Sequence, residues 1–438
     1  MDEPRTGTAP TVSVCVNATL TGRFDSVNDL ERAILEATRA AGRDLYRQGF
    51  AAFQAAWLHT RRDRFTAQRW RCLQWLTPFG PLALPVRVVR EQASGKYFSL
   101  SKILFRHQAT RRLSPALEQA AVAQATAQNY RPAARSLSHW IGSKLGHWLV
   151  WAAVQFHGAR RLLELEKLSP PSARPMKVPV LISEVDSTWL KTQTRQRAAN
   201  TARHFPVHLG LHYTGRTRRY AARGSASVRL ERKCLLASTA PLAIFGRTFQ
   251  LAGLRRFCPN LHVLLSDGDE GLEWMREKYF PQATWLLDRW HITQAVRAFV
   301  TNDQNEYRRL MAPVWQADSE AVLQALAASP LRQERPKEFR ELFGYVLGNR
   351  HGIDDWKHIP APLRRSNGRL APAVKCGSGA VEKNIEVSIN RRFKRQGRSW
   401  NPYRAERLLQ LKLLCADEPR WQQWWKSKPQ FITKPNPP

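Results

Sequence analysis

Apolar residues recur every three or four positions through much of the first 165 residues, which predicts helices. The first such segment runs from Asp25 to about Thr60, and Asp25 or Ser26 can cap it. Over residues 77–100, two short apolar alternations flank turn residues, so we expect a small β-hairpin there. This part of the chain is therefore expected to be mostly α-helical.

The helical spacing returns in pieces over residues 114–165. Two of these pieces meet at Gly142 and Ser143, an arrangement that resembles a helix-turn-helix whose second helix enters the major groove of DNA. Lys144 and His147, at the start of that second helix, are then candidate DNA contacts. The alternative interpretation is that the same helices only build the core of an all-α bundle.

Beyond a Pro-rich break at 168–179, short apolar runs typical of strands replace the helical spacing. We expect strands at 178–186, 205–215, 226–239, 260–267 and 283–290, and helices at 240–257 and 271–280. This order predicts the α/β class with a mixed sheet. A helical stretch at 293–370 is too long for a simple connection and predicts an all-α insertion.

The expected domains follow from these changes of pattern. They are an N-terminal helical region with a small hairpin (1–110), a helix-turn-helix-like DNA-binding domain (111–170), a mixed-sheet core (178–292), the all-α insertion (293–370), a final helix segment (371–415) and a basic C-terminal tail (416–438).

The charge of the chain points to a polyanion as its partner. Its 438 residues include 69 Lys and Arg against 35 Asp and Glu, a formal net charge of +34. Because phosphate contacts release counterions, the affinity of such a chain for DNA or RNA should fall steeply with salt. A membrane surface would call for a concentrated basic or amphipathic segment, whereas this charge is spread along the chain.

The remaining composition excludes several classes of protein. No window approaches the roughly 18 apolar residues of a membrane span, so we expect no membrane partner. The N-terminus lacks the features of a secretory signal, and the six cysteines are scattered without a CxxC pair. We therefore expect a cytoplasmic protein with neither a disulfide scaffold nor a zinc finger.

Three acidic residues stand in positions suited to metal chemistry. Asp186 and Asp267 each end an apolar, strand-like run, and Glu382 lies on an expected helix that is rich in Arg and Lys. Hard cations such as Mg²⁺ and Mn²⁺ take oxygen ligands from carboxylates, and two such ions can drive in-line displacement at phosphorus. Taken singly, a strand-end Asp is more often a turn or cap residue, and Glu382 could form a surface ion pair. The order of two strand Asp residues and a helical Glu is much harder to obtain by accident.

This order resembles the ribonuclease H-like core of DDE transposases and integrases. Similarity to bacterial insertion-sequence transposases of the mutator-related and ISLre-type groups is most specific in DSTWLKTQ (186–193), SDGDEGLEWMREKYFPQATWLLDRWHI (266–292) and GSGAVEKNIEVSINRRFKRQGRSW (377–400). In those groups a C/D-x-x-H signature follows the second acid, and a helical insertion separates it from the glutamate. Here Asp288 and His291 match the signature, while Ser187 stands where the groups commonly have Gly. His291 would support the site or act only as a structural histidine.

The resemblance implies that Asp186, Asp267 and Glu382 are catalytic and bind two Mg²⁺ or Mn²⁺ ions. Asp269 and Asp288 are the competing second acids. The candidate phosphate contacts beside the glutamate are Arg391, Arg392, Lys394, Arg395 and Arg398. Trp189 and Lys191 could meet an unpaired base, because aromatic rings stack on bases without reading sequence. The alternatives are a solvated basic face for the arginines and core packing for Trp189.

These expectations describe a bacterial cytoplasmic DNA transposase. It would bind the terminal inverted repeats of its element, cut the DNA with metal-activated water and join the 3′-hydroxyl end to target DNA. Pairing two element ends implies at least a homodimer on DNA. A non-catalytic, domesticated DNA-binding protein and a structure-specific nuclease with the same core are the alternatives.

Overall fold

The fold is described from a computed structural model of the chain. It describes residues 13–20, 23–104, 112–166, 174–193, 202–220, 226–359, 379–395 and 398–426. The first part of the Pro-rich break, the end of the expected insertion and the tail beyond residue 426 lie outside these ranges. The chain divides into a terminal unit, Met1–Leu165 with Leu414–Pro438, and a central unit, Glu166–Leu413.

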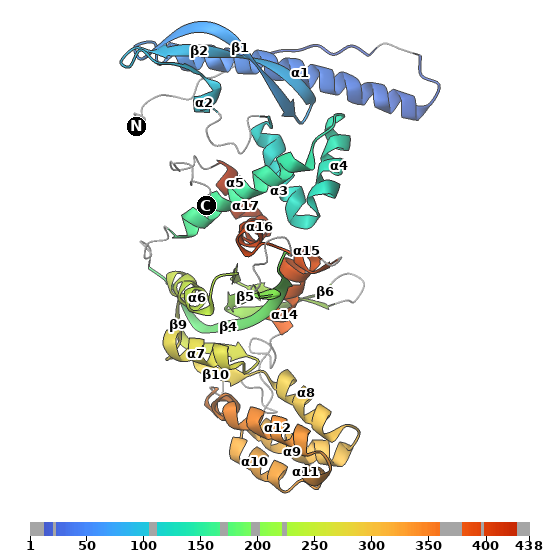
Figure 1. The fold of residues 1–438 in the computed structure, drawn as a ribbon, viewed down its shortest axis with the longest axis vertical. Helices are drawn as coiled ribbons and strands as arrows, with labels where there is room; N and C mark the ends of the chain where they lie inside the picture. The colour runs from blue at the N-terminus through green and yellow to red at the C-terminus, as the bar shows by residue number, and fades with distance from the viewer. Residues whose placement is uncertain are drawn as a thin grey trace. The chain divides into compact units, whose positions relative to one another are not determined.

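In the terminal unit, a long helix lies along a twisted antiparallel sheet (Figure 1). The helix α1 (Val27–His59) begins at Ser26, whose side chain accepts a hydrogen bond from the backbone N–H of Asp29, so the expected N-terminal helix is confirmed. The sheet has the order β1-β2-β3, with β1 (Phe65–Thr77), β2 (Gly80–Glu91) and β3 (Tyr97–Ser99). The β2–β3 pair is the expected hairpin, and the long strand β1 was not expected.

The rest of the terminal unit is helical. After the short α2 (Ser101–Leu104) come α3 (Pro115–Ala127), α4 (Tyr130–Ile141) and α5 (His147–Glu166). Gly142 ends α4 in the left-handed conformation, at φ 65°, where the sequence predicted a turn. The C-terminal helix α17 (Glu418–Lys426) packs on α5, and the indole N–H of Trp424 donates to Glu164 at 2.6 Å.

The central unit contains a five-stranded mixed sheet of order β10-β9-β4-β5-β8. Its strands are β4 (Met176–Lys191), β5 (His204–Tyr213), β8 (Cys234–Ser238), β9 (Phe257–Ser266) and β10 (Thr284–Leu287). The first three pair antiparallel, whereas β9 is parallel to both β4 and β10. A separate hairpin is formed by β6 (Gly215–Tyr220) and β7 (Ala226–Glu231). The predicted mixed α/β architecture is confirmed, and it is consistent with a ribonuclease H-like core.

The alternation of side chains along β4 gives the sheet two different faces. Val185 packs against α6 (Leu242–Arg256) and α7 (Glu270–Tyr279), together with Phe245 and Met275. Ile182 points to the opposite face, where it packs with Trp356. Because Glu184 and Asp186 follow Ile182 at intervals of two, their side chains belong to that second face.

A helical bundle follows β10 (Figure 1). It comprises α8 (Arg289–Val300), α9 (Gln304–Gln316), α10 (Ser319–Ala327), α11 (Leu331–Glu334), α12 (Pro336–Gly348), α13 (Arg350–Asp354) and the 3₁₀ turn η2 (Asp355–His358). Its buried residues form a core that extends to Leu287 at the end of β10. The bundle thus begins four residues earlier than the expected insertion and packs directly against the sheet.

The chain then returns to the sheet through a further helix. It consists of α14 (Gly379–Ile385), a π-helical turn η4 (Glu386–Asn390) and α15 (Arg391–Phe393). Helix α16 (Pro402–Cys415) follows, and its Glu406 accepts hydrogen bonds from Ser238 Oγ and the Thr239 N–H at the end of β8. None of the helices in the described ranges is long and apolar enough to cross a membrane.

Candidate active site

The first acid, Asp186, lies inside a strand and not at its end. Pairing of β4 with β5 continues to Lys191, so the expected strand boundary at residue 186 was wrong. Pairing of β4 with β9 stops at Glu184, opposite Leu265. Asp186 therefore projects from the part of β4 that extends beyond the last paired residue of β9, and this stagger leaves its side chain partly exposed.

The second acid, Asp267, begins the loop where β9 ends. Its backbone oxygen accepts a hydrogen bond from the Tyr345 hydroxyl at 2.8 Å, so helix α12 of the bundle holds this loop directly. The next residue, Gly268, has φ +85°, and a Cβ placed there would come within 2.2 Å of the Asn349 amide oxygen. A glycine is thus required both by the backbone conformation and by the close approach of the bundle.

The two competing acids both cap helices. Asp269 is exposed and accepts a hydrogen bond from the Gly271 N–H at 2.8 Å, at the start of α7. The carboxylate of Asp288 is only 1% exposed and accepts from the Trp290 N–H at 2.8 Å, at the start of α8. For both residues a role as an N-cap explains the acid at that position.

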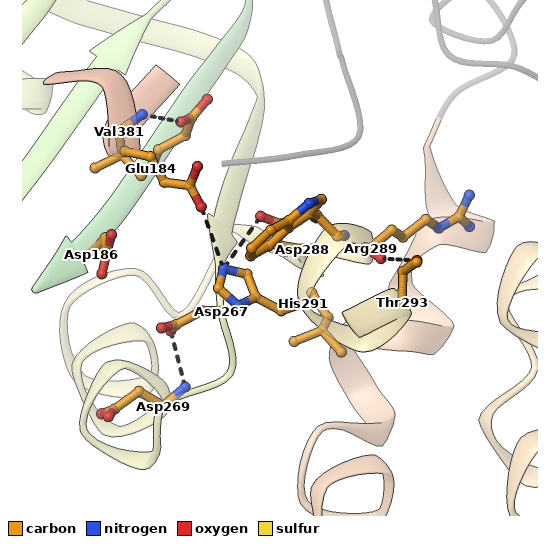
Figure 2. A network of polar contacts seen from close by, with 12 residues as sticks. Glu184, Asp186, Asp267, Asp269, Asp288, Arg289, His291, Thr293 and Val381 are labelled. Carbon is orange, nitrogen blue, oxygen red and sulfur yellow. Dashed lines mark hydrogen bonds and ion pairs between the residues drawn. The ribbon is translucent and has the colours of Figure 1, made fainter. Parts of the chain in front are cut away.

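The third acid, Glu382, lies beside His291. The Nε2 atom of His291 lies 3.8 Å from Glu382 Oε1, on α14, and also 3.8 Å from Asp288 Oδ2 (Figure 2). Asp186 and Asp267 lie to the left of the imidazole in the same view, and each interacts electrostatically with His291. Parts of the chain that are nearly 200 residues apart are therefore brought around one histidine.

The electrostatics of the two aspartates reflect this crowding. Burial raises the pKa of Asp186 to about 6, and the charge of Asp267 adds to the rise, while the Ser187 N–H and His291 oppose it. Glu382 contributes a smaller repulsion to the same group. Burial also raises the pKa of Asp267. The carboxylates thus repel one another in a partly desolvated setting, which a bound cation would offset.

Asp186, Asp267 and Glu382 offer carboxylate oxygens, which are the ligands that a hard divalent cation prefers. The positions of these carboxylates are less favourable. Among the residues that the structure describes, no three His, Cys, Asp or Glu side chains are grouped so that they could hold a metal ion. Asp186, Asp267 and Glu382 are neighbours around His291, and binding would require their carboxylates to move closer together.

A further acid in this region, Glu184, was not singled out in the sequence. Its side chain is fully buried and accepts hydrogen bonds from the Tyr213 hydroxyl at 2.5 Å, Arg216 Nη2 at 2.7 Å and the Val381 N–H at 2.8 Å. The signal in the sequence was an acid inside the apolar run VLISEVD, where an unpaired charge would be costly.

The basic residues after Glu382 differ in their surroundings. Arg391 and Arg395 are exposed and lie 3.4 and 3.3 Å from Glu386. Arg392 is only 1% exposed and lies over the Trp400 ring, so the expected phosphate contact by this residue was wrong. Lys394 donates to Thr188 on β4, and Arg398, which is partly buried, donates to the backbone oxygen of residue 392.

The other candidate DNA contacts lie on the surface. Trp189, on β4 beyond the first acid, is 59% exposed, so the alternative that it packs in the core was wrong. Lys191 is exposed on the same strand. Lys144 and His147 are also exposed, but they belong to the terminal unit, at the turn before α5.

Comparisons with known proteins do not assign the chain to a family. No protein-family model matches the chain, and no curated protein matches it. Among solved structures, a chain of the Drosophila P element transposase strand transfer complex is similar over 72% of this chain and 80% of its own, at 9% identity and a TM-score of 0.23. A TM-score this low carries no argument about function, which must be argued from the site.

Proposed function

We propose that the protein is a DNA transposase of the DDE type, which cleaves DNA and joins the 3′-hydroxyl end to a target by phosphoryl transfer. The observation that carries this proposal is the meeting of Asp186, Asp267 and Glu382 around His291, from two neighbouring parallel strands and a returning helix. The formal charge of +34 supports a nucleic acid as the substrate.

In this proposal Asp186, Asp267 and Glu382 hold two Mg²⁺ or Mn²⁺ ions. When bound, such ions activate the attacking oxygen and stabilise the leaving oxygen at phosphorus. His291 orients Glu382 and is itself oriented by Asp288, which is buried at the start of α8. Asp267 is preferred as the second acid because both competitors use a carboxylate oxygen to cap a helix.

The DNA would be held beside this site. Arg391 and Arg395 are exposed and can exchange their contact with Glu386 for phosphates. Trp189 and Lys191 offer an aromatic ring and a cation on the strand that carries the first acid. The terminal unit would recognise the repeats through the turn at Lys144 and His147, and two protomers would pair the two ends.

A strand-transfer assay tests the proposal. The substrates are DNA fragments that flank the gene, with a supercoiled plasmid as target and Mg²⁺ or Mn²⁺ in the buffer. Asp186→Asn, Asp267→Asn and Glu382→Gln should each reduce cleavage and joining by at least about 100-fold while binding to the end fragments persists. The matched control is Asp303→Asn, an exposed cap of α9 that should retain full activity.

The outcomes separate the candidate functions. Cleavage without joining would replace the transposase by a nuclease with the same site. If all three variants kept their activity, the assignment of Asp186, Asp267 and Glu382 as the catalytic acids would be overturned. Binding to DNA with no metal-dependent cleavage by the wild type would leave a non-catalytic DNA-binding protein. Light scattering of the complex with end fragments measures whether two protomers assemble on DNA.

A further inference from the structure

The buried carboxylate of Glu184 connects the strand that carries the first acid to the helix that carries the third. Its Oε1 accepts hydrogen bonds from the Tyr213 hydroxyl and Arg216 Nη2, which are only 1% and 9% exposed. Its Oε2 accepts from the backbone N–H of Val381, in the first turn of α14 (Figure 2). Both oxygens therefore have donors, and these come from different elements.

The positions of these partners relative to the site are specific. Glu184 precedes Asp186 by two residues on β4, so the two side chains lie on the same face of the sheet. Val381 directly precedes Glu382. A single carboxylate thus sets the distance between the backbone that bears the first acid and the backbone that bears the third.

A second contact holds the same helix farther along the same face. Lys394, just after α15, donates to the hydroxyl of Thr188, which follows Asp186 by two residues on β4. The helical segment from Val381 to Lys394 is therefore attached to β4 at both ends. Glu184 holds the end nearest Glu382, where the first-turn N–H groups of a helix have no partner within the helix.

An ordinary buried ion pair with Arg216 would explain only half of this geometry. Such a pair contributes little net stability, since the desolvation of two charges offsets their attraction. It gives no reason for the second oxygen to face a backbone N–H on an element nearly 200 residues away. That second contact is the one that bears on the site.

We propose that Glu184 is a positioning residue, which holds α14 against β4 so that Glu382 stands close to Asp186. The inference rests on the proposed function for its consequence in catalysis, but the attachment itself can be measured without any activity. Removing the attachment should let α14 detach locally, while the sheet and the helical bundle stay folded.

The variant is Glu184→Gln, and its matched control is Ser183→Ala. The single amide oxygen of Gln would accept from Tyr213 and Arg216, so that its NH2 group faces the Val381 N–H and the hydrogen bond to α14 is lost. Ser183 is also fully buried and precedes Glu184 on β4, but it faces the other side of the sheet, where it bonds to His212 and His262. Hydrogen exchange of peptides covering residues 379–395 should accelerate at least about 10-fold in Glu184→Gln and stay unchanged in Ser183→Ala. If Glu184→Gln fails to fold, Glu184→Asp keeps the charge opposite Arg216 and withdraws the carboxylate from Val381, and it should give the same local acceleration.

The catalytic consequence has its own readout. With full-length protein and end-fragment DNA, the Mn²⁺ concentration for half-maximal cleavage should rise about 10-fold in Glu184→Gln, with DNA binding unchanged, and stay as in the wild type for Ser183→Ala. If the wild type does not cleave, the proposed function fails while the exchange experiment still tests the attachment. Unchanged exchange over 379–395, or acceleration throughout the sheet, would overturn the positioning role of Glu184.

Discussion

Replacing Asp186 by Asn should stabilise the metal-free protein at pH 8. The pKa of this carboxyl is raised from its ordinary value of 3.8 to about 6, first by burial and then by the charge of Asp267. Above pH 6, folding therefore places an ionised carboxylate where ionisation is unfavourable. Asn removes the charge, and its amide oxygen can still accept the hydrogen bond that the Ser187 N–H now donates at 2.5 Å.

The magnitude follows from the same pKa. A rise from 3.8 to about 6 corresponds to about 3 kcal/mol of lost stability once the group is ionised in both states. Because solvent reaches part of the side chain, we take about 2 kcal/mol as the expected gain for Asp186→Asn. The native state binds this proton more tightly than the unfolded state, so the gain is present above pH 6 and disappears as the pH falls below 3.8.

Calorimetric unfolding in EDTA at pH 8 and pH 4 measures this effect. In a unit of this size, about 2 kcal/mol should raise the Tm by about 5 °C at pH 8, with a much smaller rise at pH 4, where the carboxyl is protonated in the native state and partly protonated in the unfolded state. Asp303→Asn, at an exposed cap far along the chain from the site, should leave the Tm unchanged at both pH values. Mn²⁺ should stabilise the wild type more than Asp186→Asn. A Tm gain that is absent at pH 8, or equal at both pH values, would refute the reasoning.

Three further changes test other parts of the site. Gly268→Ala should lower the free energy of unfolding in urea titrations by about 1–3 kcal/mol, because Gly268 has a φ of +85° and its added Cβ would meet Asn349. The control is Gly344→Ala, at an exposed position of α12, which should raise the free energy of unfolding by about 0.5–1 kcal/mol. Tyr345→Phe should lower it by about 1 kcal/mol in the same titrations, since the loop of the second acid loses its hydrogen bond to α12. Replacing both Arg391 and Arg395 by Ala should reduce the slope of log K against log salt for end-fragment binding by about 2; an unchanged slope would exclude them as phosphate contacts.

Regular local spacing made several elements predictable. The helix at Val27–His59 and its Ser26 cap follow from the apolar period and a capping residue, both of which act over a few positions. Strands β4, β5, β9 and β10 were placed by their apolar runs, whereas the single strand expected at 226–239 is divided into β7 and β8. Strand β1 was missed because its first half is exposed on both sides, so no alternation of apolar and polar residues marks it.

Local spacing gave wrong predictions where strand pairing or packing between distant segments determines the strand boundary or the exposure of a side chain. The boundary at Asp186 was placed too early because β5 continues to pair with β4 beyond the apolar run. Arg392 was taken for a surface residue, although it is only 1% exposed and lies over the Trp400 ring. Trp189 is 59% exposed on the part of β4 that extends past β9, and no single segment of the sequence reveals that exposure.

The sequence by itself determined most of the order of helices and strands, the positive charge and which acids follow apolar runs, because these depend on residue type and spacing along a few turns or pleats. Only the tertiary structure decided that β4 extends past β9, so that Asp186 lies near Asp267, and that Glu184 reaches Val381 across 197 positions of the chain. Those contacts, and the pKa of about 6 at Asp186, arise from burial and from charges brought close in space. Neither these contacts nor the raised pKa can be derived from neighbouring residues in the sequence.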